Sequence, residues 1–473
     1  MKLNELTIKQ AHKGLEKKDF SAVDLINDCI TAIEEKNADL NAYLAVFKER
    51  AIRDAKSVDV KIAQKEGIGV LEGIPLAIKD NILIQDTKCT GGSKILENYI
   101  SAYDATVIKK LREAGGIFLG KTNMDEFACG SSTENSAYGP TKNPHDLKKV
   151  PGGSSGGSAA ALSADMCLGA FGSDTGGSVR QPASLCGNIG FKPSYGRVSR
   201  YGLMAMASSF DQISPFAKSV EDAEILYKAV AGKDKYDSTT VDKPLGLDEK
   251  IDLKKLRVGL PKEYYKGLGG NIKDKIKEKV NILKGLGAEI KEVSLPHTDY
   301  ALAVYYIIMP SELSSNLARF DGVRYGYSAY KKSSVKNLLE TYMESRAIGF
   351  GKEIKRRIMI GTYALSSGYY DAYYKKSTAV RAVIKQDFDK VFNEVDCLIT
   401  PTSPSVAWNL GEKIDDPLKM YLSDIYTVSA NVAGIPAISI PCGDIDGLPI
   451  GLQIIGKQFD ENTVLRTAKE LHA

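Results

Sequence analysis

The sequence predicts an α/β fold, and three observations lead to this prediction. Short apolar runs that end abruptly in polar residues, such as residues 74–78 before Lys79, are typical of buried strands. Amphipathic stretches that end in glycine, such as residues 106–116, are typical of helices. Segments of the two kinds alternate along the chain, which indicates strands and helices arranged around a sheet.

The first two regions follow this pattern in order. Residues 1–70 are expected to form a helical lead-in, with two amphipathic helices over residues 3–36, the second capped by Ser21, and a third helix over 47–65. Residues 71–232 are expected to form the core. Its predicted strands are residues 74–78, 117–120 and 167–171, and residues 188–193 fit a strand or a loop.

The second half adds a polar linker, a helical region and a return to the sheet. Residues 233–249 are polar and carry Lys, Asp and Pro, which is typical of a loop. We expect residues 233–390 to combine this linker and a strand at 256–260 with a mostly helical insertion. Residues 391–473, beginning with a strand at 395–400, would return to the core sheet. The whole chain, 1–473, is therefore expected to form one domain.

The composition is that of an ordinary globular protein. The chain has 473 residues, of which 43% are hydrophobic and 26% charged, and its net charge is +4. Lysine-rich stretches alternate with acidic and apolar residues, so a nucleic-acid groove is not indicated. Seven cysteines occur without a Cys-x-x-Cys pair, which predicts neither a disulfide framework nor a zinc site. The sequence shows no signal peptide or long apolar run, so we expect a cytoplasmic protein without membrane contact.

Two glycine-serine elements are the most informative feature of the sequence. Residues 152–158 read Gly-Gly-Ser-Ser-Gly-Gly-Ser, and residues 174–178 read Asp-Thr-Gly-Gly-Ser. The first element runs directly into an alanine-rich stretch that favours helix, so these glycines belong to structured turns and not to a flexible linker. Ser178 would follow a strand and begin a helix, where free backbone N–H groups can stabilise an oxyanion. The second element alone also fits a tight structural turn capped by serine.

A serine nucleophile needs a base, and histidine is the usual one. The chain has four histidines, and none lies in a compact motif with a serine, so a Ser-His-Asp triad has weak support. Lys79 can replace histidine if burial leaves its amine neutral, with a second serine relaying the proton. Taken alone, a lysine at a strand end also fits a solvated or ion-paired residue.

Three blocks together resemble the amidase signature family. They are residues 73–80, residues 152–158, and residues 172–183 with the sequence Gly-Ser-Asp-Thr-Gly-Gly-Ser-Val-Arg-Gln-Pro-Ala. They occur in the order and with the spacing of that family. The resemblance implies the amidase signature fold, which is a central mixed β-sheet covered by helices on both faces.

The resemblance also implies a Ser-cisSer-Lys triad. Ser178 would attack the amide carbonyl, Ser154 would bridge, and Lys79 would be the final base. The chemistry fits, because the proton taken from Ser178 through Ser154 can return to the leaving nitrogen. The oxyanion hole would consist of backbone N–H groups of Thr175, Gly176, Gly177 and Ser178. No metal or cofactor is implied for this chain.

Other segments resemble the A subunits of tRNA-dependent glutamine amidotransferases. The segments are residues 124–136, 142–144, 191–202, 314–322, 355–359 and 421–441. The resemblance implies a glutaminase within a heterotrimer, whose B and C subunits use the ammonia to amidate glutamyl-tRNA or aspartyl-tRNA. ATP, Mg²⁺ and most contact with the aminoacyl-tRNA would belong to the B subunit, and no ATP-binding loop is expected here.

A glutamine pocket needs both charges, because free glutamine carries an α-carboxylate and an α-ammonium group. The resemblance suggests Arg357 and Asp424 for these roles. Without it, Arg357 fits an exposed arginine on a basic helix, and Asp424 fits a helix cap. The other substrate-binding candidates are Gly130, Ser131 and Tyr306, or Tyr305 in place of Tyr306.

Two alternatives remain at this stage. The first is a stand-alone amidase of a small or aryl amide, against which the segments near residues 130–136 and 191–202 argue. The second is a non-catalytic scaffold with the same fold, against which the presence of Lys79, Ser154 and Ser178 argues. The choice between glutamyl-tRNA and aspartyl-tRNA stays open.

Overall fold

The computed structural model describes residues 2–331 and 335–472. In this part of the chain the strands form one 11-stranded sheet in the order β1-β3-β2-β4-β6-β5-β10-β11-β9-β7-β8. The sheet is mixed, because β2 runs parallel to β3 and β4, and β7 runs parallel to β8 and β9, whereas the other pairs are antiparallel. The strands are β1 (Tyr43–Val46), β2 (Pro75–Lys79), β3 (Ile117–Thr122), β4 (Gly169–Asp174), β5 (Ile189–Lys192), β6 (Gln212–Ala217), β7 (Arg257–Pro261), β8 (Glu289–Val293), β9 (Cys397–Pro401), β10 (Ala437–Ile445) and β11 (Leu448–Gly456).

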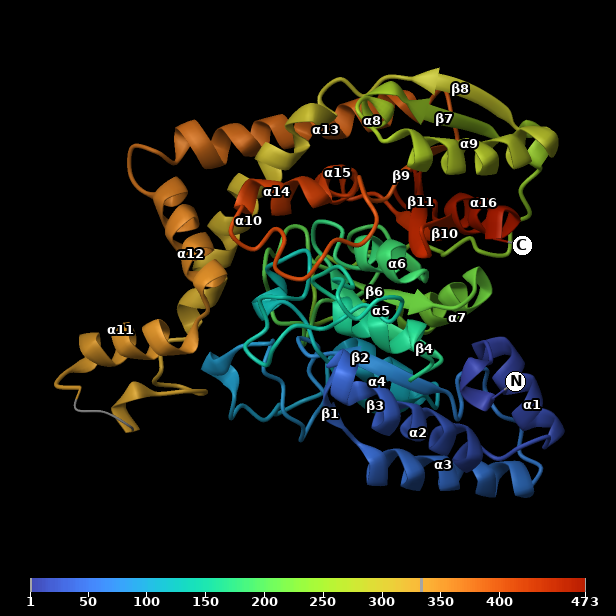
Figure 1. Ribbon diagram of the computed structural model, residues 1–473, viewed down its shortest axis with the longest axis horizontal. Coiled ribbons are helices and arrows are strands. Elements are labelled where there is room, and N and C mark those ends of the chain that lie inside the picture. Colours follow the sequence, from blue (N-terminus) through green and yellow to red (C-terminus); the bar gives the residue numbers. More distant parts are fainter. Residues whose placement is uncertain (1, 332–334, 473) are drawn as a thin grey trace.

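Helices cover the sheet and extend beyond it as an arm (Figure 1). Helices α5 and α6 pack on the central strands and on each other, and α7 and α16 form a second such pair. Helices α10 to α13 form the arm, with α11 at its tip. The helices are α1 (Ile8–Lys17), α2 (Ala22–Leu40), α3 (Lys48–Ala63), α4 (Thr106–Glu113), α5 (Gly156–Ser163), α6 (Arg180–Cys186), α7 (Val220–Val230), α8 (Lys262–Tyr265), α9 (Gly270–Gly285), α10 (Ala301–Asn316), α11 (Leu338–Gly349), α12 (Lys352–Leu365), α13 (Lys376–Val391), α14 (Pro417–Tyr421), α15 (Val428–Ala433) and α16 (Glu461–His472).

Local sequence signals explain where several elements begin and end. Ser21 caps α2 as expected, because its Oγ accepts a hydrogen bond from Asp24 N at 3.0 Å and Asp24 Oδ2 accepts one from Ser21 N at 3.0 Å. Gly115 follows α4 with a φ of +83°, a conformation that glycine adopts without strain. Every residue of β2 and β4 is buried, including the polar residues at their carboxyl ends, which are Lys79, Ser173 and Asp174.

The strands and helices predicted from the sequence are present, with boundaries shifted by a few residues. The predicted mostly helical insertion also contains the strand β8, whose residues Glu289–Val293 (Glu-Ile-Lys-Glu-Val) pair with β7. Short strands β1 and β6 and the β10–β11 hairpin were not predicted individually. Strands β7 and β8 extend the same sheet that contains residues 71–232, so the linker region 233–390 contributes to the sheet as well as to the arm.

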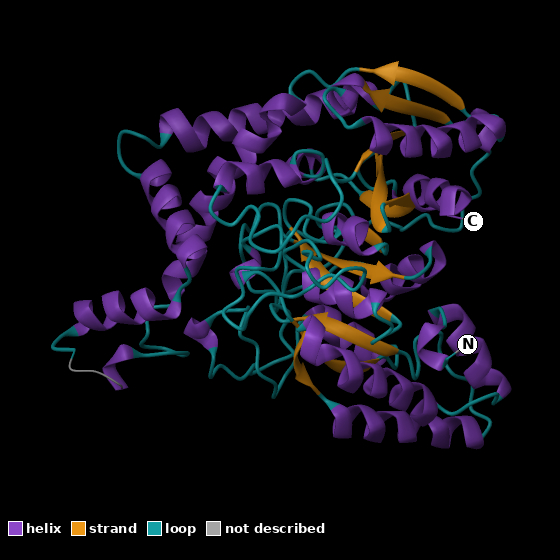
Figure 2. Ribbon diagram, in the orientation of Figure 1, coloured by secondary structure: helices purple, strands orange, loops and turns teal. Residues whose placement is uncertain are grey.

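Two large clusters of buried apolar side chains join these helices and strands. One lies between the N-terminal helices and the sheet and contains Ile78 and Phe171, and the other joins the arm to the C-terminal strands and contains Ile308 and Phe388. Irregular loops gather between the sheet and the arm, as Figure 2 shows. In the described part of the chain, no helix has the length and apolar character needed to cross a membrane.

Candidate active site

Lys79 lies at the carboxyl end of β2, and its side chain is fully buried. Its Nζ lies within hydrogen-bond distance of Ser154 Oγ at 2.8 Å, Ser155 Oγ at 2.8 Å and Ser173 Oγ at 3.0 Å. The peptide bond between Gly153 and Ser154 is cis. The amine is therefore surrounded by hydroxyl groups, which can both donate and accept a proton.

The surroundings of Lys79 favour its neutral form. Burial lowers the pKa of Lys79 to about 7, although Asp125, Asp174 and Asp211 raise it in part. Burial dominates because, among the described residues, no carboxylate forms an ion pair with Lys79. At neutral pH a large fraction of this amine can accept a proton.

Two other buried lysines lack this arrangement. Lys121 Nζ lies 3.7 Å from Asp80 Oδ1, which makes it part of an ion pair. Burial lowers the pKa of Lys192 to about 7 as well, but its Nζ donates to the carbonyl oxygen of Pro193 at 3.0 Å. A lowered pKa alone therefore does not identify the base, and the hydroxyl partners of Lys79 distinguish it.

Lys121 belongs to a second sequence pattern that needs a structural explanation. Residues 115–122 match the Gly-x-x-x-x-Gly-Lys-Thr pattern of phosphate-binding loops, although no such loop was expected. In the structure Ile117–Thr122 form the fully buried strand β3. A phosphate-binding loop would have to follow a strand and open a helix, so this pattern does not form one.

Ser178 lies in the turn between β4 and α6, with 7% of its surface exposed. Its carbonyl oxygen accepts a hydrogen bond from Ser155 N at 3.2 Å, which places this turn beside the segment that carries Ser154. The structure thus brings Lys79 and Ser154 into direct contact and sets the turn of Ser178 beside them.

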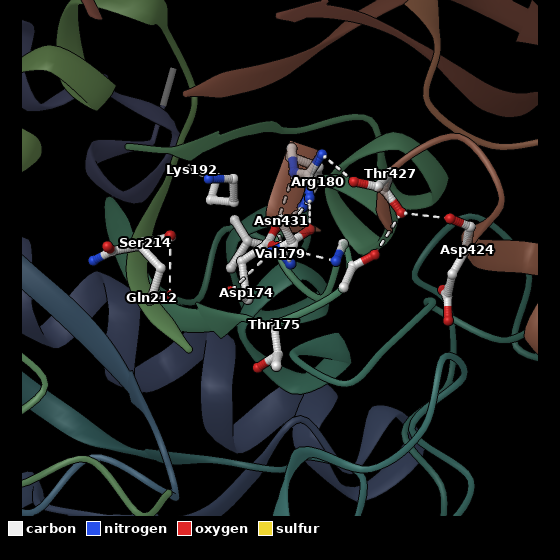
Figure 3. A network of polar contacts seen from close by, with 12 residues as sticks. Asp174, Thr175, Val179, Arg180, Lys192, Gln212, Ser214, Asp424, Thr427 and Asn431 are labelled. Atoms are coloured by element: carbon white, nitrogen blue, oxygen red, sulfur yellow. Dashed lines mark hydrogen bonds and ion pairs between the residues drawn. The ribbon is translucent and has the colours of Figure 1, made fainter. Parts of the chain in front are cut away.

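Asp174 and Arg180 form a buried ion pair that supports this turn (Figure 3). Arg180 Nη2 lies 3.0 Å from Asp174 Oδ1, and Arg180 Nε donates to Asp174 Oδ2 at 3.1 Å. Burial raises the pKa of Asp174, but the charge and hydrogen bonds of Arg180 outweigh it and lower the pKa to about 2. The ionised carboxylate can therefore accept hydrogen bonds from the backbone of the turn.

The predicted oxyanion donors are not equivalent. Gly177 N donates to Asp174 Oδ1 at 2.9 Å, so this N–H is already engaged. Among the described residues, no hydrogen-bond partner is present for the N–H groups of Thr175, Gly176 and Ser178. These three groups are the candidate oxyanion donors with a free N–H in this conformation.

Asp424 ends a short 3-10 helix, Leu422–Asp424, and is buried. Its Oδ2 accepts hydrogen bonds from Ser131 Oγ at 2.8 Å and from Tyr306 OH at 2.8 Å. Within the described chain, Oδ1 has no hydrogen-bond donor. Burial raises the pKa of Asp424 to about 7, while the two hydroxyl donors and Arg357 favour the ionised form. A bound ammonium group would favour ionisation further.

Arg357, on α12, carries the positive charge that complements the carboxylate of Asp424. Its guanidinium carbon lies 4.6 Å from the ring centre of Tyr306 and 4.1 Å from that of Tyr421. Its Nε pairs with Glu353 Oε1 at 2.6 Å. Among the described residues, neither Nη atom has a hydrogen-bond partner. The two Nη atoms of the guanidinium group can therefore bind a carboxylate. The structure thus buries Arg357 instead of leaving it on a basic surface.

The two neighbouring tyrosines take different positions. Tyr306 contacts Asp424 and stacks on Tyr421 with ring centres 4.2 Å apart. Tyr305 packs against the nucleophile turn, because a Cβ added to Gly176 would lie 2.7 Å from its Cζ. Tyr306 therefore lies beside Asp424 and Arg357, whereas Tyr305 borders the turn.

Gln181 links the segment of Ser131, which contacts Asp424, to the segment that carries Ser154. Its Nε2 donates to the carbonyl oxygen of Ser131 at 2.9 Å, and its Oε1 accepts from Gly153 N at 3.0 Å. Gly130 precedes Ser131, and a Cβ there would lie 2.3 Å from Asp125 Cγ, so this loop position has no room for a side chain. Gly130 therefore allows the loop to pack closely against Asp125.

Sequence reasoning missed several residues of the site. Ser155, Ser173, Asp174 and Arg180 lie inside the recognised blocks, so their side chains could have been considered there. Gln181 also lies in the third block, and Tyr421 begins the segment 421–441. Their contacts, like those of Glu353, appear only when distant segments meet. No described hydrogen bond joins a histidine to Ser154 or Ser178. The described residues also contain no metal-binding cluster of His, Cys, Asp or Glu.

Known proteins resemble this chain over nearly its whole length. A family model described as Amidase matches residues 24–465. The chain belongs to the amidase family. This amidase chain is 54% identical over 472 residues to the A subunit of glutamyl-tRNA(Gln) amidotransferase from Thermoanaerobacter pseudethanolicus, and the match covers 99% of this chain and 96% of that protein. The corresponding protein of Halalkalibacterium halodurans is 53% identical, with 99% and 97% covered.

Solved amidase structures share the fold. The A subunit of glutamyl-tRNA(Gln) amidotransferase from Thermotoga maritima has a TM-score of 0.82 at 42% identity, covering 99% of this chain and 94% of that one. A 6-aminohexanoate cyclic dimer hydrolase complexed with substrate has a TM-score of 0.83 at 25% identity, covering 100% and 97%. The predicted amidase fold, a mixed sheet with helices on both faces, is confirmed.

Proposed function

We propose that this amidase chain is the glutamine-hydrolysing component of a tRNA-dependent amidotransferase. The observation that supports it best is the pairing of a buried amine and serine with a pocket of two opposite charges. Lys79 contacts Ser154 at 2.8 Å, and the neighbouring pocket presents Arg357 and Asp424. A zwitterionic amide such as glutamine matches these charges, whereas a neutral aryl amide would leave Asp424 Oδ1 and the Nη atoms of Arg357 without partners.

The reaction begins with proton transfer away from Ser178. As its Oγ attacks the side-chain carbonyl carbon of glutamine, Ser154 takes the proton and passes its own to neutral Lys79. The negative charge on the carbonyl oxygen is stabilised by the N–H groups of the turn, with Gly176 and Ser178 as the central donors. The proton then returns to the leaving nitrogen, which departs as ammonia.

Water completes the cycle by the same relay. Lys79 and Ser154 take a proton from water as it attacks the acyl ester on Ser178, and the proton returns to Ser178 Oγ as the ester bond breaks. The products are glutamate and ammonia, and the side chains end in their starting protonation states. Arg357 and Asp424 hold the α-carboxylate and the α-ammonium group of glutamine throughout the reaction and contribute mainly to binding.

The relatives' names suggest the rest of the assembly. We propose B and C partner subunits in a heterotrimer, with ATP and Mg²⁺ bound by the B subunit, which also binds most of the aminoacyl-tRNA. The ammonia would convert glutamyl-tRNA(Gln), or aspartyl-tRNA(Asn), to the amidated form in the cytoplasm. The near-balanced charge of this chain, +4, fits a component that does not itself form the main tRNA surface.

The test measures ammonia release from glutamine by the chain alone and by the chain co-expressed with B and C subunits, with and without ATP and glutamyl-tRNA. Strong stimulation in the complete complex is expected, and aspartyl-tRNA in a parallel reaction distinguishes the acceptors. A complex that hydrolyses no glutamine, combined with robust turnover of small or aryl amides by the isolated chain, would establish a stand-alone amidase instead.

A further inference from the structure

Thr427 lies between the substrate pocket and the nucleophile turn. It is fully buried and immediately precedes α15. Its Oγ1 lies 2.7 Å from the carbonyl oxygen of Gly176 and 3.2 Å from that of Asp424. Because a hydroxyl group has one proton, the shorter contact to Gly176 is the stronger hydrogen bond.

The peptide unit that joins Gly176 to Gly177 is held at both ends. Thr427 Oγ1 donates to its carbonyl oxygen at 2.7 Å, and its N–H donates to Asp174 Oδ1 at 2.9 Å. A peptide unit is planar, so these two bonds fix its orientation. The peptide units on either side carry the N–H groups of Gly176 and Ser178, whose directions therefore depend on the central unit.

Packing leaves little room for another orientation. A Cβ added to Gly176 would lie 2.7 Å from Tyr305 Cζ, and one added to Gly177 would lie 2.1 Å from Thr427 Oγ1. Gly177 has a φ of +132°, which other residues rarely adopt. The turn is thus enclosed by Tyr305 on one side and by Thr427 on the other.

Thr427 is itself anchored through its backbone (Figure 3). Its N–H donates to the carbonyl oxygen of Asp424 at 3.0 Å. Its carbonyl oxygen accepts from Arg180 Nη1 at 3.0 Å, and Arg180 also pairs with Asp174. Asn431, on α15, donates from Nδ2 to Asp174 Oδ1 at 2.9 Å. The segment that carries Asp424 is therefore joined to the nucleophile turn by several hydrogen bonds.

We propose that Thr427 is a positioning residue for amide cleavage. Its hydroxyl holds the Gly176–Gly177 peptide unit, and thereby sets the oxyanion donors, in a fixed relation to the segment that carries Asp424. The choice of glutamine as substrate rests on the proposed function, but the oxyanion geometry applies to any amide that Ser178 attacks. Loss of the hydroxyl should therefore slow the reacting step and leave ground-state binding unchanged.

The test compares Thr427→Val, which removes the hydroxyl and keeps the shape, with Thr427→Ser, which keeps the hydroxyl. Both are made in the full chain co-expressed with B and C subunits. We expect Thr427→Val to lower kcat for glutamine roughly tenfold to a hundredfold, somewhat less than the roughly 10²- to 10³-fold loss of a direct oxyanion donor, with KM changed less than about twofold. Thr427→Ser should retain most of the wild-type kcat.

A matched control is Thr467→Val in α16. Thr467 is also buried, and its hydroxyl lies 4.0 Å from Cys397 Sγ. This variant makes the same chemical change outside the site and should leave kcat near the wild-type value. A second measurement is glutamine binding by calorimetry in the Ser178→Ala chain, where adding Thr427→Val should not change the affinity.

Three results would overturn the proposal: a wild-type kcat in Thr427→Val, an equal loss of kcat in Thr427→Ser, or a loss confined to KM. If the valine variant does not fold, Thr427→Ala is measured with the same expectations. If the wild-type complex hydrolyses no glutamine, the proposed function fails. The same variants are then compared on the amide that the wild-type chain does hydrolyse, which tests Thr427 separately.

Discussion

The proposed reacting centre and the proposed glutamine site, called the pocket below, are built from different parts of the chain. Lys79 and Asp174 end central strands, and Ser154 precedes a helix that packs on those strands. In contrast, Tyr306 and Arg357 come from the helical arm, and Asp424 comes from a C-terminal 3-10 helix. The centre thus belongs to the rigid sheet, and the pocket depends on how the arm packs against it.

The two regions also differ in how their charges are satisfied. The ion pair of Asp174 and Arg180 has partners on almost every polar atom, including Gln453 and Asn431. In the pocket, Asp424 Oδ1 and the Nη atoms of Arg357 have no hydrogen-bond partner among the described residues. The first arrangement stabilises a conformation, whereas the second leaves binding capacity for a ligand. Changes in the centre should therefore lower kcat, and changes in the pocket should raise KM.

The largest effect is expected from Ser178→Ala. Removing the nucleophile's hydroxyl should lower kcat by more than about 10³-fold, because no covalent intermediate can form. Folding should be unaffected, since the hydroxyl lies in a turn whose backbone is held by Asp174. Ammonia release and thermal unfolding are the measurements. Residual activity close to the wild-type level would show that Ser178 is not the nucleophile.

Replacement of Lys79 should have the next largest effect. Lys79→Met removes the base and should lower kcat by about 10²- to 10⁴-fold. Thermal unfolding should show little loss of stability, because methionine fills similar space without a buried amine to desolvate. Lys79→Arg is the matched control, since it keeps a long basic side chain that stays protonated and cannot act as a base. If the arginine variant retained activity, proton transfer to residue 79 would not be required.

The dependence of kcat on pH also tests whether Lys79 is the base. Burial lowers the pKa of Lys79 to about 7, and the neutral amine is the active form. The kcat measured at saturating glutamine should therefore fall as the pH drops through about 7 and reach a plateau above it. A kcat that stays constant from pH 8 down to about pH 5.5 would contradict a lysine base.

The sequence predicted the reacting centre far better than the pocket. Lys79, Ser154 and Ser178 lie in short blocks with turn and strand signals. Taken alone, the signals at Lys79 and Ser178 also fitted structural roles, and the family resemblance supplied the triad. The hydroxyl partners Ser155 and Ser173 were not singled out. Their role depends on where the Lys79 side chain points, which local sequence does not specify.

The pocket could not be derived from local patterns. Arg357 fitted a surface arginine on a basic helix, because its partners Glu353, Tyr306 and Tyr421 are assembled only by tertiary packing. The β8 strand was missed for a similar reason, since its short, mostly polar sequence does not alternate and is stabilised by pairing with β7 at the sheet edge. Family resemblance supplied the pocket residues, and the structure supplies their contacts.

Among the pocket residues, Asp424→Asn should have the largest effect. The amide keeps the shape but loses the negative charge opposite the substrate's ammonium group. We expect a loss of about 2–4 kcal/mol, or roughly 30- to 1,000-fold in kcat/KM, mostly as a higher KM. Kinetics with glutamine over a wide concentration range will separate the two constants. A fall in kcat at saturation with unchanged KM would place Asp424 in the reacting centre instead.

The smallest effect, from Tyr306→Phe, tests the boundary between the two regions. Tyr306 OH is one of two hydroxyl donors to Asp424 Oδ2, so its removal should raise KM by about 5- to 15-fold, corresponding to roughly 1–1.5 kcal/mol. Loss of this donor also disfavours the ionised carboxylate. The pKa of Asp424, about 7 in the intact chain, should therefore rise, and the acid limb of kcat/KM should move to higher pH.

Tyr305→Phe is the matched control for Tyr306→Phe, because the residues are neighbours and the chemical change is the same. Tyr305 packs on the nucleophile turn through its ring, which phenylalanine retains. This variant should keep the wild-type KM and the wild-type position of the acid limb. If the control instead raised KM as much as Tyr306→Phe, the pocket would extend across both tyrosines to the turn, and chemistry and binding would share one continuous surface.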